Sequence, residues 1–362
     1  MLSILDKYII KKFFVSFFFS AFMFTMIALV IDFSDKLEKF IDKELPARQV
    51  ISEYYLNFIP WINGILWPLF ALMAVIFFTS RLAKNSEIIA TLSAGVSFRR
   101  FLRPYLIAGG VLAVVHFVGS HYFIPLGNKT YINFENTYIH PSNQRLKTEN
   151  IHIFLDADSK IFIRNYRSRD TSMRGVFLER FAGGRMVELI NAEIMEWVGP
   201  PNNWRLSDYQ IRRFDGDSES FALEKKGSLD TTLNLVPADF VRYSNQKEMM
   251  TSGELRAFIA YENAKGLDTA KKMVTELHRR SADPYTILVL TIIGAAVASR
   301  KVRGGVGLHL AFGVTIGALY IVLSRFSTTF ANQLDLPSGI SVWLPNILFT
   351  IVAIVLLHRA QK

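Results

Sequence analysis

The stretch that decides the fold of this chain is Phe13–Ile31, FFVSFFFSAFMFTMIALVI, which contains no ionisable side chain. At about 1.5 Å per residue, an α-helix of this length crosses a hydrocarbon core about 30 Å thick. Five further apolar stretches follow along the chain, and Pro284–Ser299 is the shortest of them. They are Tyr54–Ser80, Pro104–Gly127, Pro284–Ser299, Gly304–Ser324 and Leu336–Leu357. The sequence therefore predicts a membrane α-helical protein with six transmembrane helices, three on each side of a polar insert.

The composition agrees with a membrane protein. Hydrophobic residues make up 51% of the chain and charged residues 20%, and there are 30 Phe. We attribute the net charge of +10 to basic loops that meet anionic lipid headgroups, and we expect no nucleic-acid partner. Because the chain contains no Cys, an exported domain would have neither a disulfide nor a thiolate metal site.

Basic residues concentrate in four segments that adjoin the predicted spans. By the positive-inside rule these segments are cytoplasmic, because short loops rich in Lys and Arg stay on that side. Both termini are then predicted to be cytoplasmic, and residues 129–283 to lie on the opposite side of the membrane. The basic residues are Lys7, Lys11, Lys12, Arg81, Lys84, Arg99, Arg100, Arg103, Arg300, Lys301, Arg303, Arg359 and Lys362.

The insert has two textures. From Ile151 to Asp239 apolar and polar residues alternate between turn-forming clusters, which predicts an antiparallel all-β domain of about eight strands. A jelly roll and a curved open sheet both fit this pattern. From about residue 252 to 280 the period is helical, which predicts two short helices with a break at Gly266. Asp283 and Pro284 suit the N-cap and first turn of the fourth span.

The predicted domains are therefore residues 1–128 with three spans, residues 129–283 with an all-β, jelly-roll-like periplasmic domain, and residues 284–362 with three spans. No phosphate-binding loop of the Gly-x-x-x-x-Gly-Lys-Ser/Thr type is present. His116 and His121 are five residues apart and point to different sides of a helix, so lining a cavity suits them better than binding zinc. The carboxylates of Asp156 and Asp158 fit a solvated turn better than a metal site. We therefore predict no catalytic residue, metal or cofactor.

The loop between the second and third spans contains a short helical segment, about residues 85–95. Its first residues can cap a helix, a carboxylate falls in the first turn, and Gly95 suits the position after the helix. A helix this short is marginal in water, so its apolar stripe needs either lipid or a groove on a cytoplasmic partner. The candidate docking residues are Asn85, Ser86, Glu87, Ile88, Ile89 and Leu92.

At the other membrane face, three lysines follow the first span at spacings of three and four. If the helix continues, Lys36, Lys39 and Lys43 share one face and can hold lipid phosphates. Interleaved Asp and Glu residues allow the alternative of local ion pairs. Arg325 is expected near the same boundary, either reaching the interface or facing a cavity.

In these features the chain resembles the LptF/LptG family, the permeases of the lipopolysaccharide-export ABC transporter. The resemblance covers the whole chain, and the region Leu323–Leu336 leans towards the LptG branch. It rests on the order of spans and β domain and on the motifs Leu82–Ile88, Ala94–Ser97, Glu276–Arg280 before Pro284, and Trp343–Asn346.

The resemblance implies a permease without enzymatic activity that takes lipopolysaccharide from the outer leaflet of the inner membrane. It implies an LptB-like ATPase dimer, a paralogous permease subunit, and LptC/LptA-like periplasmic β proteins as partners. By the same resemblance residues 85–95 are the coupling helix, Glu87 meets the ATPase, and the three lysines border the substrate. A lipid with several acyl chains needs a wide apolar chamber, which Phe24, Trp61 and Trp67 would help to line.

Two other classes remain open on the sequence. A membrane enzyme acting on lipid-linked glycans would turn over its substrate without an ATPase. A membrane anchor for a periplasmic β domain would tolerate charge reversal in the segment 85–95. Neither class needs a docking helix on the cytoplasmic side.

Overall fold

Six helices of the computed structural model are long and apolar enough to cross a membrane, as predicted. The structure describes residues 3–140, 144–146, 149–215, 218–243, 245–264, 270–300, 305–333 and 336–360. Lys301, Arg303, Gly266 and Lys362 lie outside the described residues. The spans contain α1 (Ile4–Asp42), α3 (Leu56–Lys84), α5 (Phe98–Val118), α8 (Ala270–Ala298), α9 (Gly305–Gln333) and α10 (Ser338–Ala360).

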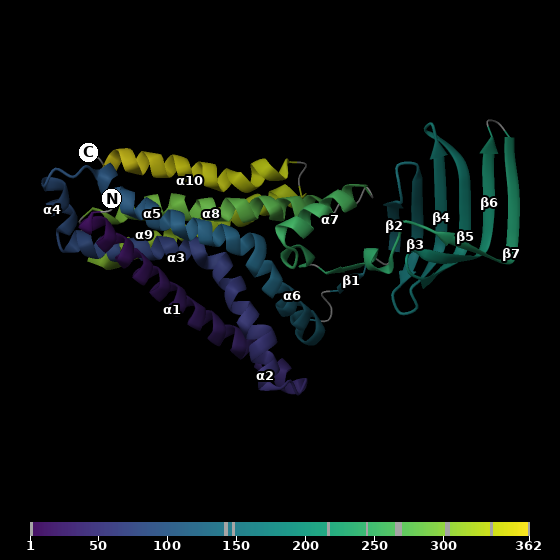
Figure 1. The fold of residues 1–362 in the computed structure, drawn as a ribbon, viewed down its shortest axis with the longest axis horizontal. Helices are drawn as coiled ribbons and strands as arrows, with labels where there is room; N and C mark the ends of the chain where they lie inside the picture. Colours follow the sequence, from purple (N-terminus) through teal and green to yellow (C-terminus); the bar gives the residue numbers. More distant parts are fainter. Residues whose placement is uncertain are drawn as a thin grey trace. The chain divides into compact units, whose positions relative to one another are not determined.

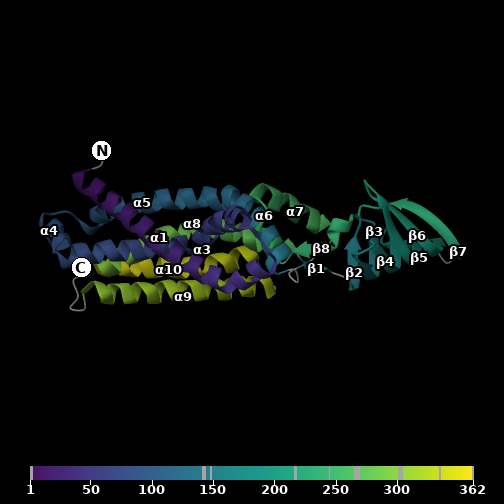
Figure 2. The same ribbon diagram turned by 90° about the horizontal axis from the view of Figure 1, so that it is seen from below.

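Shorter helical segments extend two of these spans. The second span begins with α2 (Ala47–Gln49) and η1 (Val50–Tyr55), and the third continues through η2 (Gly119–Phe123), α6 (Ile124–Phe134) and η3 (Glu135–Ile139). A separate helix, α4 (Glu87–Ser93), lies between α3 and α5. It lies at the same end of the helical bundle as the beginning of α1 and the end of α10 (Figures 1 and 2).

The fourth span differs from the prediction. Asp283 is not an N-cap, because α8 runs without interruption from Ala270 to Ala298 with Pro284 in its interior. A proline leaves the carbonyl four residues earlier without its helical partner. Here that carbonyl belongs to Arg280, and the Oγ atom of Ser120 donates to it at 3.3 Å. The neighbouring chain segment thus compensates for the proline, and the helix continues through it.

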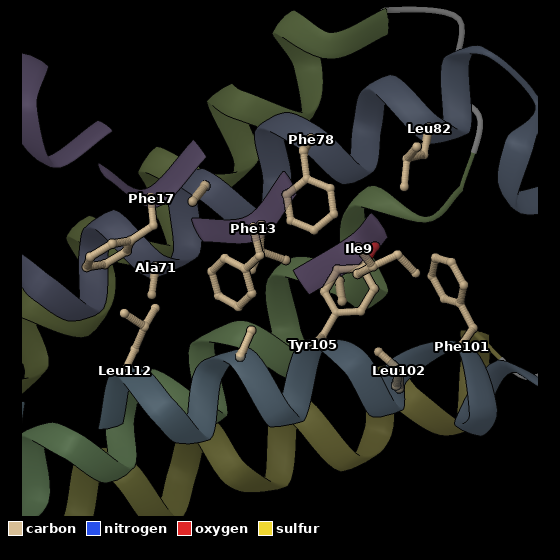
Figure 3. Close-up of a cluster of buried hydrophobic side chains, with 14 of the residues drawn as sticks. Ile9, Phe13, Phe17, Ala71, Phe78, Leu82, Phe101, Leu102, Tyr105 and Leu112 are labelled. Carbon is tan, nitrogen blue, oxygen red and sulfur yellow. The ribbon is translucent and has the colours of Figure 1, made fainter. Parts of the chain in front are cut away.

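The core between α1, α3 and α5 explains the spacing of aromatic residues in α1. Ile9, Phe13 and Phe17 recur every four residues and are buried. Figure 3 shows them directed towards α3 and α5, where Phe78 and Tyr105 lie beside them. The opposite face of α1 is apolar and exposed, as expected of a helix that faces lipid or another membrane chain.

A second core joins α3, α8, α9 and α10, and it depends on close helix approach. A Cβ atom at Gly313 would lie 2.4 Å from the Cδ1 atom of Ile76, and one at Gly317 would lie 2.6 Å from the Cδ1 atom of Leu69. Small residues at such positions let membrane helices pack tightly. Helices α9 and α10 run side by side (Figure 2).

The inserted domain is all β, as predicted, and its larger sheet is open. Six strands pair antiparallel in chain order, which is the arrangement of the open-sheet alternative. One face packs on a core in which the indole of Trp204 is fully buried and donates to the carbonyl of Leu235 at 2.9 Å. The strands of this sheet are β2 (Glu149–Phe154), β3 (Ser159–Arg167), β4 (Ser172–Ala182), β5 (Arg185–Gly199), β6 (Asn203–Asp215) and β7 (Ser218–Thr232).

Two short strands, β1 (Gln144–Leu146) and β8 (Val241–Tyr243), form a second sheet. The 3-10 helices η5 (Pro237–Asp239) and η6 (Gln246–Glu248) and the helix α7 (Ser252–Ala264) follow the large sheet. The chain divides into two compact units. One comprises Met1–Ile139, Lys247–Leu255 and Lys271–Lys362, and the other comprises His140–Gln246 and Arg256–Ala270.

Candidate functional site

A cavity of about 290 Å³ opens between α3, α8, α9 and the segment that contains Lys247 and Glu248. Its walls combine apolar side chains with charged groups, the composition that amphiphilic ligands require. Apolar residues come mainly from α3, and the charged residues come from η6, α8 and α9. The lining consists of Trp61, Ile65, Leu66, Pro68, Leu69, Lys247, Glu248, Arg279, Asp283, Leu290, Gly317, Tyr320, Ile321, Ser324, Arg325 and Thr328.

The basic side chains that line this cavity differ in whether they form ion pairs. Arg279 is held by carboxylates, with its Nη2 atom 3.0 Å from Glu276 and its Nη1 atom 3.6 Å from Asp283. Within the described residues, Arg325 and Lys247 form no ion pair with an acidic side chain. Two cationic groups at this cavity are therefore available for an anionic ligand.

Trp61 fixes one side of the cavity. Its Nε1 atom donates to the Oε2 atom of Glu248 at 3.1 Å, and its ring packs against Tyr131 with centroids 5.4 Å apart. The indole therefore presents a fixed apolar face, while its polar atom is satisfied by the segment after the β domain.

A second, smaller cavity of about 50 Å³ shares Trp61, Glu248, Arg279 and Asp283 with the first. His116 and Ser120, one helical turn apart in the third span, also line it. A space of this size admits a few water molecules, which polar lining groups would retain.

These two side chains compensate for prolines in neighbouring helices. Pro68 leaves the carbonyl of Gly64 unpaired in α3, and the Nε2 atom of His116 lies 2.8 Å from that oxygen. Because a carbonyl only accepts, Nε2 must carry the proton. Ser120 acts in the same way on α8, and Ser327 donates to the carbonyl of Ser341, which Pro345 frees in α10. In a membrane such carbonyls need partners from protein, since lipid offers none.

Arg280 ties α8 to the segment that follows the β domain. Its guanidinium group is buried, with 4% of the side chain exposed, and is paired to Glu276 at 3.2 Å. The remaining donors reach the carbonyls of Lys247 and Met250, each at 2.8 Å, and the Oγ atom of Ser252 at 3.3 Å. This network fixes Lys247 and Glu248 where they line the cavity.

The predicted substrate residues are separated by the structure. Trp61 and Arg325 line the larger cavity. Phe24 and Trp67 do not line it and pack instead on the core between α1, α3 and α5. The rings of Phe24 and Phe70 stack with centroids 5.6 Å apart, and the ring centroids of Trp67 and Phe17 are also 5.6 Å apart.

The three lysines also differ from one another. The Nζ atom of Lys36 lies 2.8 Å from Asp32 and 3.4 Å from Glu135 and contacts the hydroxyl of Tyr54. Lys39 is half-buried, whereas Lys43 follows the end of α1 and is exposed. Within the described residues neither of these two forms an ion pair. The ion-pair alternative thus describes Lys36, and the other two ammonium groups stay available.

The predicted docking segment forms α4, but its apolar residues divide between two faces. Ile88 is buried in the core between α1, α3 and α5, whereas Ile89 and Leu92 are exposed. Ser86 does not cap the helix through its side chain, and it adopts a left-handed conformation with φ of 62°. The Nδ2 atom of Asn85 instead donates to Glu87 at 3.1 Å.

Gly95 follows the end of α4 with φ of 85°, as predicted for a residue after a helix. Ile88 therefore anchors α4 to the bundle, Ile89 and Leu92 remain exposed, and Glu87 is half-buried. No group of His, Asp and Glu in the described chain is arranged to hold a metal ion.

Sequence reasoning missed Lys247, Glu248, Arg279 and Asp283 as cavity residues. Arg279 and Asp283 could have been predicted from the sequence, because ionisable residues next to an apolar span mark functional positions. The predicted start of the fourth span at Pro284 instead left both residues outside the membrane-spanning segment. Lys247 and Glu248 carried no comparable signal, since they lie in a polar segment.

Comparison with known families supports one assignment. Residues 7–359 match the family described as lipopolysaccharide export system permease LptF/LptG. A search of curated proteins gave no match. The family match covers nearly all of this multi-pass membrane chain, from α1 through the β domain to α10. The chain therefore belongs to the LptF/LptG family, the transport permeases of the lipopolysaccharide export system.

Proposed function

We propose that this chain is the permease subunit that extracts lipopolysaccharide from the outer leaflet of the bacterial inner membrane and passes it to a periplasmic bridge. The observation that carries the proposal is the cavity between α3, α8 and α9. Its apolar wall suits acyl chains, and Arg325 with Lys247 suits phosphate groups. Charge-assisted bonds from cations to phosphate are about twice as strong as neutral hydrogen bonds.

The cavity itself is small for such a lipid. At about 290 Å³ it holds one part of the molecule, so the chamber needs a second wall. The exposed apolar faces of α1 and α9, which include Phe18, Phe22, Phe312 and Phe326, supply a surface for a paralogous permease subunit. The two subunits together would enclose the acyl chains, with Lys39 and Lys43 near one rim.

The motor is a separate ATPase dimer of the LptB type. Its docking surface is α4, where Ile89 and Leu92 are exposed and the half-buried Glu87 lies in the first turn, while Ile88 holds the helix in place. Because Ile88 packs into the bundle core, α4 does not need a lipid surface to stay folded. This favours the partner groove over the lipid surface among the two alternatives for α4.

The proposed topology places both termini and α4 in the cytoplasm and residues 129–283 in the periplasm. Support comes from the basic residues near α4 and from the common location of α4 and both ends of the described chain (Figure 1). LptC/LptA-like β proteins would then extend the sheet at its edge strands β2 or β7, since an edge offers unpaired backbone groups.

Purification of the complex from native membranes tests this function. We expect an ATPase, a second permease chain and lipopolysaccharide to be recovered with this subunit. Single-Cys variants at Ser93 and Arg185 test the topology, because the natural chain has no Cys. Turnover of a lipid-linked glycan by the purified chain without any ATPase would instead support a membrane enzyme.

A further inference from the structure

The N-terminus of α1 is joined to the N-terminus of α5 by an ion pair between Asp6 and Arg100. The Nη1 and Nη2 atoms of Arg100 each lie 2.7 Å from one carboxylate oxygen of Asp6. The Asp6 side chain is 1% exposed, whereas that of Arg100 is 38% exposed. A two-pronged contact of this kind restricts both sliding and rotation of the two helices.

Asp6 is also fixed from its own side. Its Oδ2 atom accepts from the backbone nitrogen of Ser3 at 2.8 Å, and the Ser3 hydroxyl accepts from the backbone nitrogen of Asp6 at 3.2 Å. This capping box sets the start of α1 and aims the carboxylate at α5. The ion pair therefore involves the helix end itself rather than a mobile side chain.

Arg100 belongs to the segment that leaves α4. Helix α4 ends at Ser93, and α5 begins at Phe98 after the cap residue Ser97, whose hydroxyl accepts from the backbone nitrogen of Arg100 at 3.3 Å. This short connection links α4 directly to the turn that contains Arg100. The apolar contacts follow the same route, since Ile88 and Ile9 belong to one buried cluster.

Helix α1 can carry such a movement across the membrane. It has 39 residues and is about 58 Å long at 1.5 Å per residue. Lys39 lies near its far end, which the proposed function places at one rim of the lipid chamber. A bidentate ion pair at the helix end adds geometric specificity to the apolar contacts between the two helices.

We propose that the Asp6–Arg100 ion pair is the positioning contact through which α4 moves α1 during transport. The inference rests on the proposed function, since it requires an ATPase on α4 and a lipid near α1. Neither residue lines the cavity that the proposed function assigns to the lipid. Neighbouring basic side chains do not share this arrangement, because Lys7, Arg99 and Arg103 are exposed and have no acidic partner within the described residues.

The test compares the complete transporter complex with its Asp6→Asn and Arg100→Lys variants. Arg99→Gln is the matched control, because it removes a neighbouring exposed charge. Four quantities are measured: ATPase retained on purification, ATP hydrolysis, lipopolysaccharide released per ATP, and the distance between spin labels on Cys substituted at Ile27 of α1 and Val114 of α5.

In the parent complex we expect ATP with vanadate to change the label distance. Asp6→Asn should retain the ATPase and its hydrolysis, lose that distance change, and release at least about fivefold less lipid per ATP. Arg100→Lys, which keeps the charge but not the fork, should fall between Asp6→Asn and the parent. Arg99→Gln should behave as the parent in all four measurements.

The parental distance change together with parental lipid release in Asp6→Asn would overturn the inference. If Asp6→Asn does not accumulate in the membrane, Arg100→Lys decides, and full coupling in that variant overturns the inference. A parent complex that recruits no ATPase or releases no lipid contradicts the proposed function itself. The two failures are therefore distinguishable.

Discussion

The Nε2 atom of His116 lies 2.8 Å from the carbonyl oxygen of Gly64, which Pro68 leaves without its helical partner. One turn along the third span, Ser120 serves the carbonyl of Arg280 that Pro284 frees in α8. A single face of the third span thus satisfies two proline-containing helices. The prolines and their partners form one structural unit at the smaller cavity.

His116→Leu should lower the free energy of unfolding by about 1–3 kcal/mol, because it leaves the Gly64 carbonyl buried and unpaired. In a Pro68→Ala background the loss should be smaller, since the restored amide at position 68 bonds that carbonyl. Thermal unfolding of the four proteins in detergent gives the coupling between the two positions. Equal losses in both backgrounds would show that His116 does not act through Gly64.

Glu87→Lys should leave the protein folded while weakening ATPase recovery and transport. Glu87 lies in the first turn of α4, where loss of the favourable interaction with the helix dipole costs only about 0.3–1 kcal/mol. Ser93→Lys is the control, because it places a lysine at the other end of the helix without removing a carboxylate. Normal ATPase recovery and lipid export in Glu87→Lys would remove the docking role of this carboxylate.

Substitution of the lysines after the first span should have two different effects, one on stability and one on lipid contact. Lys36→Gln should destabilise the protein, by about 1.5–3 kcal/mol for each charge-assisted hydrogen bond that it removes, since Asp32 and Glu135 would lose their shared cation. Lys39→Gln with Lys43→Gln should keep stability and reduce photo-crosslinking of lipopolysaccharide. Stability and crosslinking are measured on the same preparations. Reduced stability in the Lys39 and Lys43 variant would indicate that these side chains have structural partners.

The stability contributed by Glu254 at the N-terminus of α7 should depend on pH. Lys129 and then Thr251 bond the carboxylate of Glu254 and lower its pKa from 4.5 to about 2. A lowered carboxyl pKa means that its stabilising contribution is complete above pH 4.5 and is lost as pH falls through about 2. Hence the difference in thermal midpoint between the parent and Glu254→Gln should shrink over that interval. A difference that stays constant down to pH 2 would contradict the ionic role.

The sequence predicted the membrane class well for a physical reason. A stretch such as Phe13–Ile31 without ionisable groups has few structures open to it in lipid, and alternation along Ile151–Leu155 leaves little choice but a strand. The start of α8 was mispredicted because Asp283 and Pro284 carry local capping signals. The hydrogen bond from Ser120 to the carbonyl of Arg280 lets the helix continue through Pro284 despite these signals.

The candidate site was harder to predict than the fold. Trp61, which the sequence predicts to line an apolar chamber, and Arg325, which it predicts near the outer boundary, both line the cavity, and their contact with substrate stays a prediction. The sequence also predicts Phe24 and Trp67 to line the chamber, but aromatic residues suit both chambers and cores, and periodicity does not distinguish these environments. Lys36 and Lys39 are three residues apart on the same helix, so the sequence treats them alike. Which of them pairs with Asp32 and Glu135 depends on how the helices pack.

The central claim is that the cavity between α3, α8 and α9 receives a phosphorylated lipid. A photoreactive residue at Ile321, which lines the cavity, tests it most directly, with Val352 on the exposed side of α10 as the control. We predict a lipopolysaccharide adduct at position 321 that exceeds the one at position 352 and falls in Arg325→Gln with Lys247→Gln. Equal adducts at both positions, or an adduct at position 321 that is unchanged in that double variant, would contradict the claim.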